Sequence, residues 1–341
     1  MYKLLIFGTG SKCEELLKEH EEHFKQYDII GFLDNNEKKQ GKYFNRKIIY
    51  SPGEIDLLKY DYIYIASSFV KEITTQLVVQ CKVKEECILP WWYFGIKNNL
   101  LINEKKINQT LKDNEDLKKC KMVIYTAIFG SYDNLNDPEY IEDNCDYVCF
   151  TDDENLKSDI WDIRIIKDMD INHTRKMAEQ YSILAHKYFS EYKISVYVDG
   201  NVLIKGSFRE YSLKYMKHHN MLAFPHPWRY CAYDEAIFSK KCDNYKEDNL
   251  YDMIARYEKE GLPKNMGLIS AGIMVRRHNE SDVIKTMECW WDEVKANSSN
   301  DQVSYTYAAW KQSFCYDMSP LWIYDNEYVT ILKHKKDLVD D

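Results

Sequence analysis

The chain has 341 residues, of which 45% are hydrophobic and 14% aromatic, and this is enough apolar material for folded cores to exclude wholesale disorder. The formal net charge is −9, from 46 Lys and Arg against 55 Asp and Glu, which argues against nucleic-acid binding through a broadly basic surface. At roughly 150 residues per domain, the length predicts two domains.

Residues 1–96 are predicted to form a Rossmann-like domain. Short apolar runs alternate with helical patterns, which is typical of a parallel, doubly wound sheet. A helix is predicted through Lys18 after the first strand, another begins near Pro52, and a third covers 71–80. The predicted strands are 2–7, 28–33, 61–66 and 87–89, and an apolar run at 47–50 precedes the helix start near Pro52.

The first predicted strand ends in a glycine turn. Gly8-x-Gly10 stands between a strand and a helix, where glycines permit a tight turn and helix N–H groups can meet a phosphate. Asp34 ends the second strand, where an acid would meet a ribose hydroxyl, but Cys13 replaces the third glycine of the full fingerprint. Residues 1–90 resemble the N-terminal domain of nucleotide-sugar-dependent acyltransferases. Either this domain binds a nucleotide or nucleotide sugar through Gly8, Gly10 and Asp34, or it is retained for packing or partner contact.

A charged, Asn-rich stretch, 97–120, is predicted to be a linker, and a second α/β domain is predicted over 121–341. Apolar residues at helical spacing predict one long helix over 174–192, followed by a strand over 194–198. Further strands are predicted at 122–128, 147–150 and 270–275, and further helices at 282–295 and from Asp301.

The most informative site follows the strand 194–198, where the chain continues as Asp199-Gly200-Asn201. Alternate residues of an extended chain share a side, so the side chains of Asp199 and Asn201 can face one hard cation, Mn²⁺ or Mg²⁺. Such a cation neutralises a diphosphate leaving group. The same triplet is also common turn chemistry, so its context must decide.

Other blocks surround this triplet in a defined order: 126–133, 147–152, 173–176, 225–229, 233–236, 270–275 and 300–304. In this order they resemble a GT-A glycosyltransferase domain. More closely, they resemble the plant-mucilage-type glycosyltransferase-like family, formerly a domain of unknown function. The resemblance covers 121–336 and implies a GT-A-like mixed sheet, a nucleotide-sugar donor, and a glycan or glycolipid acceptor.

A more distant resemblance, to retaining glycogenin-type galactosyl- and glucosyltransferases, implies roles for single residues. Asp199, Asn201 and His334 would hold the metal, although Asn201 stands where those enzymes usually carry a second, more strongly charged Asp. A solvated basic tail is the alternative for His334 and its neighbours. Asp301 and Gln302 would lie near the anomeric carbon as catalytic residues. The donor contacts would be Thr126, Ala127, Tyr132, Asp152, Arg175, Lys176, Ala271, Gly272 and Lys335.

Acceptor contacts are predicted between residues 225 and 236. His226 lies between two prolines with Trp228 nearby, which suits the face of a sugar, and a rigid packing loop is the alternative. Asp234 and Glu235 either activate an acceptor hydroxyl as a base or add negative charge to the first turn of a helix.

The residues also indicate a cellular setting. No apolar run approaches the roughly 20 residues of a membrane-spanning helix, and the opening run at 2–7 is too short for a signal peptide. Ten cysteines form no Cys-x-x-Cys pair, so we expect reduced thiols in a cytoplasmic protein. Peripheral contact with the inner face of the membrane is a further alternative. A basic amphipathic helix would indicate such contact, and the sequence shows none clearly.

The sequence therefore predicts a two-domain α/β glycosyltransferase that moves a sugar from a nucleotide-diphosphate donor, expected to be a UDP-sugar, to a hydroxyl of a surface glycan. One alternative is an NAD(P)-linked nucleotide-sugar oxidoreductase or epimerase in the first domain, which the missing third glycine disfavours. Another alternative is a non-catalytic binding module in a glycan-assembly complex, because Asn201 stands where related enzymes carry a second acid.

Overall fold

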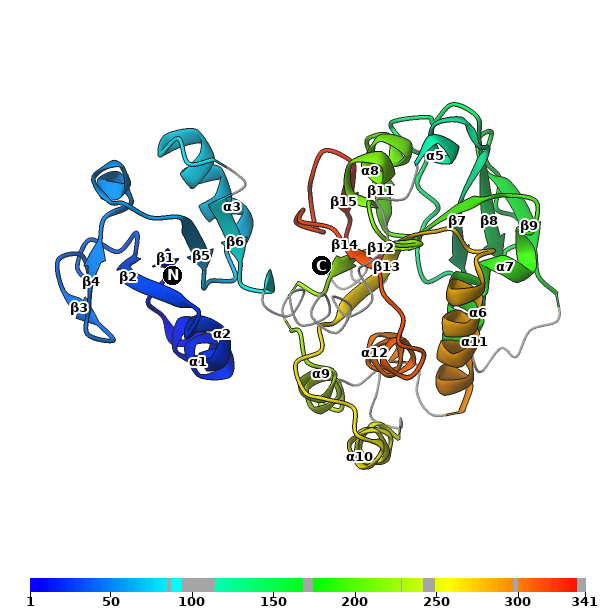
Figure 1. The fold of residues 1–341 in the computed structure, drawn as a ribbon. Coiled ribbons are helices and arrows are strands. Elements are labelled where there is room, and N and C mark those ends of the chain that lie inside the picture. The colour runs from blue at the N-terminus through cyan, green and yellow to red at the C-terminus, as the bar shows by residue number, and fades with distance from the viewer. Residues whose placement is uncertain are drawn as a thin grey trace. The chain divides into compact units, whose positions relative to one another are not determined.

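The chain folds into two compact units, Met1–Lys97 and Asn98–Asp341 (Figure 1). The structure is a computed structural model. It describes residues 1–84, 87–93, 114–167, 174–227, 229–241, 249–296 and 300–335.

The first unit is a six-stranded sheet in the order β3-β4-β2-β1-β5-β6, parallel except for the β3–β4 pair. Helices α1 and α2 lie on one side of the sheet and α3 on the other (Figure 1). This is the doubly wound arrangement that alternating strands and helices predict. The elements are β1 Tyr2–Phe7, α1 Ser11–Glu19, α2 Glu21–Phe24, β2 Tyr27–Leu33, β3 Tyr43–Phe44, β4 Lys47–Tyr50, η1 Pro52–Leu57, β5 Tyr62–Ile65, α3 Val70–Thr75, the π-helical η2 Gln76–Gln80 and β6 Ile88–Pro90.

The second unit contains a mixed seven-stranded sheet in the order β14-β12-β13-β10-β7-β8-β9. Strand β13 is antiparallel to both β10 and β12, whereas the other neighbours are parallel. A separate antiparallel ribbon pairs β11 with β15. The strands are β7 Met122–Ile128, β8 Cys145–Thr151, β9 Asp162–Ile165, β10 Ile194–Val198, β11 Val202–Ile204, β12 Met221–Pro225, β13 Ile269–Arg276, β14 Asp317–Met318 and β15 Val329–Ile331.

Helices pack on this sheet, with α6 and α11 side by side (Figure 1). Strand β7 is buried on both faces: Val123 and Tyr125 belong to the cluster that includes α6, α11 and α12, and Met122 and Ile124 to the cluster that includes α8. A strand covered on both sides has the continuous apolar sequence seen here. The helices are α5 Glu115–Lys119, α6 Thr174–Ile183, α7 Ala185–Tyr188, α8 Phe208–Tyr215, α9 Ala232–Ser239, α10 Leu250–Glu260, α11 Ser281–Ala296 and α12 Asp301–Lys311.

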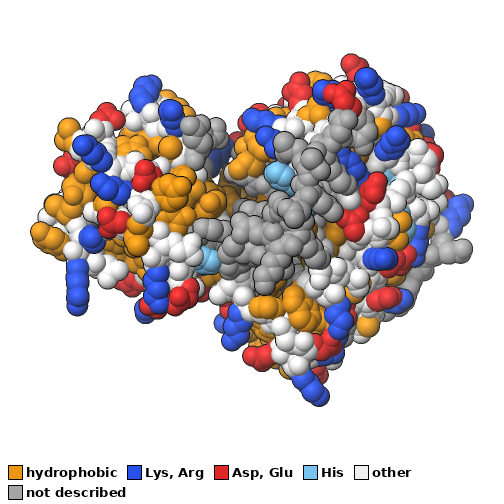
Figure 2. Space-filling model, viewed as in Figure 1, with side chains coloured by type: hydrophobic (Ala, Val, Ile, Leu, Met, Phe, Trp, Pro, Cys, Tyr) orange, Lys and Arg blue, Asp and Glu red, His pale blue; other side chains and the backbone are white. Residues whose placement is uncertain are grey.

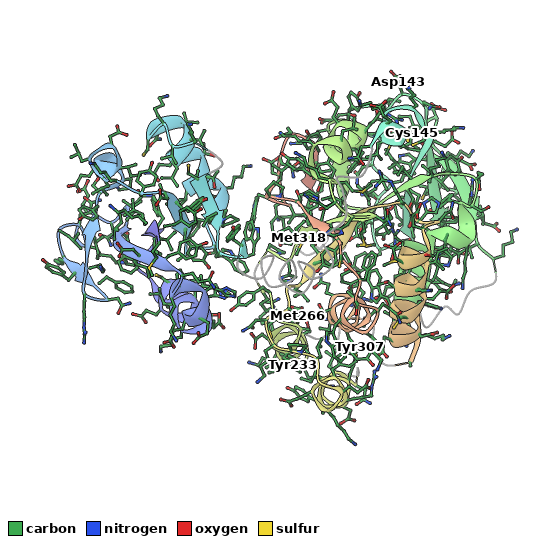
Figure 3. The ribbon with its side chains drawn as sticks, viewed as in Figure 1. Asp143, Cys145, Tyr233, Met266, Tyr307 and Met318 are labelled. Carbon is green, nitrogen blue, oxygen red and sulfur yellow. The ribbon has the colours of Figure 1, made fainter. Side chains whose placement is uncertain are left out.

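A third apolar cluster joins α9, α10 and α12. Tyr233, Met266 and Tyr307, which Figure 3 labels, belong to it. The rings of Tyr257 and Tyr307 stack with their centroids 4.0 Å apart. This packing fixes α12, and with it Asp301 at its first turn.

The prediction of one long helix over 174–192 is wrong, because the chain breaks at Leu184 between α6 and α7. The fully buried Arg276 donates to the carbonyl of Ile183 at 3.1 Å and to the carbonyl of Ser182 at 2.6 Å. These carbonyls would otherwise accept from N–H groups four residues later, so the regular helix ends here.

The end of the predicted linker packs into the second unit as α5. Leu117 is fully buried, and the side-chain amide of Asn114 donates to the carbonyl of Met216 at 2.9 Å. Arg277 donates to the amide oxygen of Asn114 at 2.8 Å. Residues 97–113 of that prediction lie outside the described residues.

The surface is mixed in charge. On the face drawn in Figure 2, Lys and Arg side chains are interspersed with Asp and Glu on each unit. Within the described ranges, no helix combines the length and the apolar character that a membrane span requires.

Candidate active site

Asp199 is held at the end of β10. Its N–H donates to the carbonyl of Gly272 at 2.8 Å, and the hydroxyl of Tyr197 donates to its Oδ1 at 2.8 Å. A Cβ at Gly272 would lie 2.5 Å from Oδ2 of Asp199, so the glycine leaves the space that the carboxylate occupies. Burial raises the pKa of Asp199, while the hydrogen bond from Tyr197 and the charge of His334 lower it.

The segment after β15 closes on the turn that follows Asp199. The N–H of Leu332 donates to the carbonyl of Asn201 at 2.8 Å, and Nδ2 of Asn201 donates back to the carbonyl of Leu332 at 3.0 Å. Nε2 of His334 lies 3.5 Å from Nδ2 of Asn201. Asn201 and His334 therefore meet. Both are predicted metal ligands, and they lie more than a hundred residues apart in the chain.

Asp133, which the sequence analysis did not select, joins this group. Its two carboxylate oxygens lie 3.0 and 3.1 Å from Nδ1 of His334, and Oδ1 accepts from the N–H of Lys335 at 3.3 Å. A Cβ at Gly200 would lie 2.9 Å from Cβ of Asp133, so the glycine of the turn permits the close approach.

A pocket of about 340 Å³ opens at this junction, and Asp133, Asn201 and Lys335 line it together with Asn134, Asn136, Leu332 and Lys333. The exposed ring of Tyr132 packs edge-on against His334, with the centroids 5.0 Å apart. The structure thus brings Tyr132, Asn201, His334 and Lys335 together, although they come from three separate segments of the sequence.

A second charged group lies at the start of α12. Burial raises the pKa of Asp301 to about 6, while the charge of Arg175 lowers it and that of Asp199 raises it. Nε of Arg175 donates to Oε1 of Glu179 at 3.2 Å. Glu179 is buried, its Oε2 has no hydrogen-bond partner among the described residues, and burial and the charge of Asp301 raise its pKa. Arg175 therefore acts on several acidic groups: it donates a hydrogen bond to Glu179, and its charge lowers the pKa of both Asp199 and Asp301.

The other predicted donor residues are spread over β7, the end of β8, α6 and β13. Both carboxylate oxygens of Asp152 accept from the N–H of Gly130, at 3.0 and 3.1 Å, so Asp152 fixes the loop after β7. The hydroxyl of Thr126 is buried without a partner in the described part of the chain, and Lys176 donates to the carbonyl of Lys295 at 3.4 Å. Ala127 and Ala271 are buried, and Gln302 is half-buried in the first turn of α12.

Two of the predicted acceptor residues lie in an internal network. Nδ1 of His226 accepts from the N–H of Arg229 at 2.9 Å, and burial lowers the pKa of His226 to about 4. Glu235 accepts from Nε of Arg229 and from the hydroxyl of Ser239, the latter at 2.7 Å. The side-chain amide of Asn300 donates to Ser239 at 2.9 Å. The network thus reaches the residue that precedes Asp301.

This geometry favours a positioning role for His226 and Glu235 over direct contact with a sugar, because their polar atoms already meet protein partners. Asp234 has an exposed side chain in the first turn of α9. Trp228 lies outside the described residues.

The glycine turn of the first unit is tightly tied. Gly8 has φ +108°, and a Cβ there would lie 2.9 Å from the carbonyl oxygen of Ala66. Oδ2 of Asp34 accepts from the N–H of Thr9 at 3.2 Å, from the Thr9 hydroxyl and from Lys39 at 3.2 Å. Although burial raises the pKa of Asp34, these bonds hold it below its usual value. A pocket of about 440 Å³ lies over this turn, and Gly8, Gly10 and Asp34 line it.

The metal prediction can be tested against the donor atoms. Within the described residues, no three His, Cys, Asp or Glu side chains form a ready-made metal cluster. The predicted set has one carboxylate, one amide and one imidazole, and no described donor reaches Oδ1 of Asn201. Oxygen donors suit Mg²⁺ and Mn²⁺, and a carboxylate behind a histidine is the usual support of a metal ligand. The donor chemistry of Asp199, Asn201 and His334 therefore fits a divalent cation, held by a ligand set with a single carboxylate charge.

Three site residues were missed for which the sequence held a local signal. Asp133 ends a block that was already recognised, Tyr197 lies two positions before Asp199 on the same face of a strand, and Glu179 lies one helical turn after Arg175. Their partners become visible only in the folded chain.

Polar side chains gather beyond the ends of β7 and β10 in a mixed α/β sheet, as expected for a glycosyltransferase-like domain. Residues 103–335 match the family model described as TOD1/MUCI70, glycosyltransferase-like domain, and the chain belongs to this family. Residues 1–89 match the model described as C2185-like, N-terminal. The expected family and the α/β fold class are confirmed, and the family supports glycosyltransferase activity in general.

Two solved structures show weaker likeness. UDP-D-quinovosamine 4-dehydrogenase from Vibrio fischeri is 24% identical over 26% of this chain and 76% of its own, with a TM-score of 0.22. The bifunctional glycosyltransferase WbbM is 10% identical over 59% of this chain and 38% of its own, with a TM-score of 0.36. Both TM-scores are too low to bear on function. No curated protein matches the chain.

Proposed function

We propose that the second unit transfers a sugar from a nucleotide-diphosphate donor, a UDP-sugar, to a hydroxyl of a glycan or glycolipid acceptor in surface polysaccharide synthesis. The observation that carries the proposal is the meeting of His334 with Asn201, which lies two residues beyond Asp199 in the turn after β10, beside a pocket that Asn201 and Lys335 line. Membership of a glycosyltransferase-like family supports it. The resemblance to glycogenin-type enzymes favours a hexosyl donor and retention of the anomeric configuration.

Asp199, Asn201 and His334 would hold Mn²⁺ or Mg²⁺. When bound, the cation supplies positive charge to the departing diphosphate. Lys335 adds a positive charge to the same pocket, and Arg175 is oriented by Glu179 beside Asp199 and Asp301. The hydrogen bond to Glu179 orients Arg175 before the donor arrives, which is how a preorganised site stabilises developing charge.

Asp301 is proposed to stabilise positive charge that develops on the sugar ring, with Gln302 orienting the acceptor. Because burial raises the pKa of Asp301 to about 6, its carboxyl is mostly ionised at pH 7 and mostly protonated at pH 5. If the ionised form is required, kcat/KM for the donor rises about tenfold from pH 5 to pH 7 and then levels off, because kcat/KM reports the titration of the free enzyme. Arg175 and Asp199 are the charges that act on this group, and Arg175 opposes the shift.

The measurement is a pH–rate profile of donor consumption with saturating acceptor. Asp301→Asn is expected to be slow at every pH and to lack the rise between pH 5 and 7. An unchanged rise in that variant would assign the titration to another group and remove Asp301 from the charge-stabilising role.

A thermal-shift screen of nucleotides and nucleotide sugars, with and without Mn²⁺, tests the proposed function. Ligands that bind the folded state stabilise it by mass action, by about 2.7 kcal/mol at a concentration 100 times Kd. We expect UDP and one or more UDP-sugars to raise the melting temperature only when Mn²⁺ is present. Asp199→Ala should abolish the shift, whereas Asp292→Ala, at a side chain that is 70% exposed, should keep it.

The same screen tests a second candidate, nucleotide or nucleotide-sugar binding by the first unit. The pocket of about 440 Å³ over the Gly8 turn favours this candidate. A shift that persists in Asp199→Ala would assign binding to the first unit. A shift with NAD(P) alone, unchanged in that variant, would overturn the transferase proposal in favour of a nicotinamide-linked activity.

A further inference from the structure

A relay of three buried polar side chains, Glu235, Ser239 and Asn300, leads from α9 to the first turn of α12. Oε2 of Glu235 accepts a hydrogen bond from Nε of Arg229, and Oε1 accepts from the hydroxyl of Ser239 at 2.7 Å. Nδ2 of Asn300 donates to Oγ of Ser239 at 2.9 Å, and Oδ1 of Asn300 accepts from the N–H of Val303 at 3.1 Å. The three residues are 5%, 2% and 1% exposed, so their hydrogen bonds are stronger than they would be in water.

The charge of Glu235 sets the direction of the hydrogen bonds in the relay. Although burial raises the pKa of Glu235, its interactions with His226 and Arg229 hold that pKa below the usual value. The carboxylate therefore only accepts, and it takes the single hydroxyl proton of Ser239. The lone pairs of Ser239 are left to accept from Nδ2 of Asn300. This orientation of the amide turns Oδ1 toward the start of α12, which it caps.

The capped turn carries the residues that the proposed function places at the sugar. Asp301 and Gln302 follow Asn300 directly in the chain. A second anchor comes from α11, where Nε1 of Trp290 donates to the carbonyl of Asp301 at 2.8 Å. The relay thus fixes the start of α12 from the side of α9, and Trp290 fixes it from the side of α11.

We infer that Glu235 and Ser239 are positioning residues for Asp301, and that they act through the orientation of Asn300. The inference rests on the proposed function, because that function gives Asp301 its role in sugar transfer. Neither Glu235 nor Ser239 contacts the donor in this scheme. The relay links the segment that was predicted to contact the acceptor with the turn that carries the proposed catalytic residues.

Two substitutions break the relay at different atoms. Ser239→Ala removes the hydroxyl, so Nδ2 of Asn300 loses an acceptor. Glu235→Gln keeps the size of the side chain, but its amide must turn Oε1 toward the guanidinium of Arg229, which only donates. The new NH2 group then faces Ser239, whose proton has no acceptor unless Asn300 turns its oxygen away from α12. Both substitutions therefore weaken the cap.

Steady-state kinetics measure the effect on transfer. A displacement of about 1 Å can cost about 100-fold in rate, and the anchor at Trp290 remains, so we expect kcat to fall about tenfold in Ser239→Ala and Glu235→Gln. KM for the donor should change less than about threefold, because no residue proposed to hold the diphosphate lies in the relay. In an Asp301→Asn background, Ser239→Ala should have almost no further effect. The matched control is Ser212→Ala, since Ser212 is also fully buried but donates to a carbonyl of its own helix, α8.

Hydrogen exchange of a peptide that covers the first turn of α12 tests the contact without any substrate. We expect faster exchange there in Ser239→Ala and Glu235→Gln than in the wild type and Ser212→Ala, because a weakened cap lets the turn open. Unchanged exchange in both relay variants would overturn the inference. Equal losses of kcat from Ser239→Ala with and without Asp301→Asn would overturn it as well, because a positioning residue for Asp301 acts only through that residue.

Failure of this inference and failure of the proposed function are distinguishable. If the wild type transfers sugar and Asp301→Asn is slow, but both relay variants keep the wild-type kcat, the proposed function stands and the inference fails. If the wild type transfers no sugar from any nucleotide-sugar donor, the proposed function fails and exchange alone decides the inference. Faster exchange in both relay variants then supports a relay that positions Asp301, and unchanged exchange removes it.

Discussion

Asp199→Ala is expected to lower kcat/KM for sugar transfer by about 1000-fold, the larger part of it in kcat. In the proposed site, Asp199 is the one full negative charge among the three metal ligands, since Asn201 is neutral and His334 binds metals as neutral imidazole. A metal that polarises a leaving group contributes several kcal/mol to the transition state, and each 1.36 kcal/mol is a factor of ten in rate. A site with a second carboxylate could retain part of that effect, but here Asn201 cannot.

The loss should come with little change in folding. The buried hydroxyl of Tyr197 loses its acceptor, which costs about 1–3 kcal/mol, but the cost of burying the carboxylate disappears as well. The measurements are steady-state release of UDP and a thermal melt of the variant beside Asp292→Ala. Turnover within a factor of three of the wild type would show that the reaction does not depend on Asp199 as a metal ligand, whereas no transfer by the wild type with any nucleotide-sugar donor would favour the non-catalytic assembly module.

Much of the fold could be predicted because its strands are short apolar runs bounded by polar turns. The predicted ranges 2–7, 122–128 and 194–198 are confirmed without change as β1, β7 and β10. The long helix over 174–192 could not be predicted correctly. Its break depends on the buried guanidinium of Arg276, which takes carbonyls that a helix would use and comes from a strand almost a hundred residues later.

The residues of the candidate site were likewise predicted only in part. Asp199 and Asn201 were recognisable because their chemistry lies within three residues at the end of a strand. His334 was recognised through a resemblance, but its partner Asp133 was not, since nothing local links two residues 201 positions apart. The enclosure of Glu235 by Arg229 and Ser239 was equally invisible, because a charge in the first turn of a helix is most often solvated.

Gly272→Ala is expected to disable the site although it replaces none of the proposed metal ligands. Gly272 lies in β13 and has no left-handed backbone, so alanine is sterically allowed by the main chain. Its methyl group, however, would lie 2.5 Å from Oδ2 and 3.2 Å from Cγ of Asp199. The carboxylate must rotate away, which breaks the hydrogen bond from Tyr197 and moves the one charged ligand. We expect kcat/KM to fall about 100-fold, because a displacement of about 1 Å costs that much in a preorganised site.

The measurement compares turnover and Mn²⁺ affinity of Gly272→Ala with those of Gly53→Ala. A Cβ at Gly53 meets only the Ser51 hydroxyl at an ordinary 3.7 Å, so that variant controls for the substitution itself. In an Asp199→Ala background, Gly272→Ala should cost nothing more, because the atom it displaces has gone. If it instead lowers activity further, the glycine also makes room for the donor sugar, and the predicted contact of Gly272 with the donor gains support. If Gly272→Ala alone has wild-type turnover and Mn²⁺ affinity, the position of the Asp199 carboxylate does not matter for catalysis, and the metal site must be sought elsewhere.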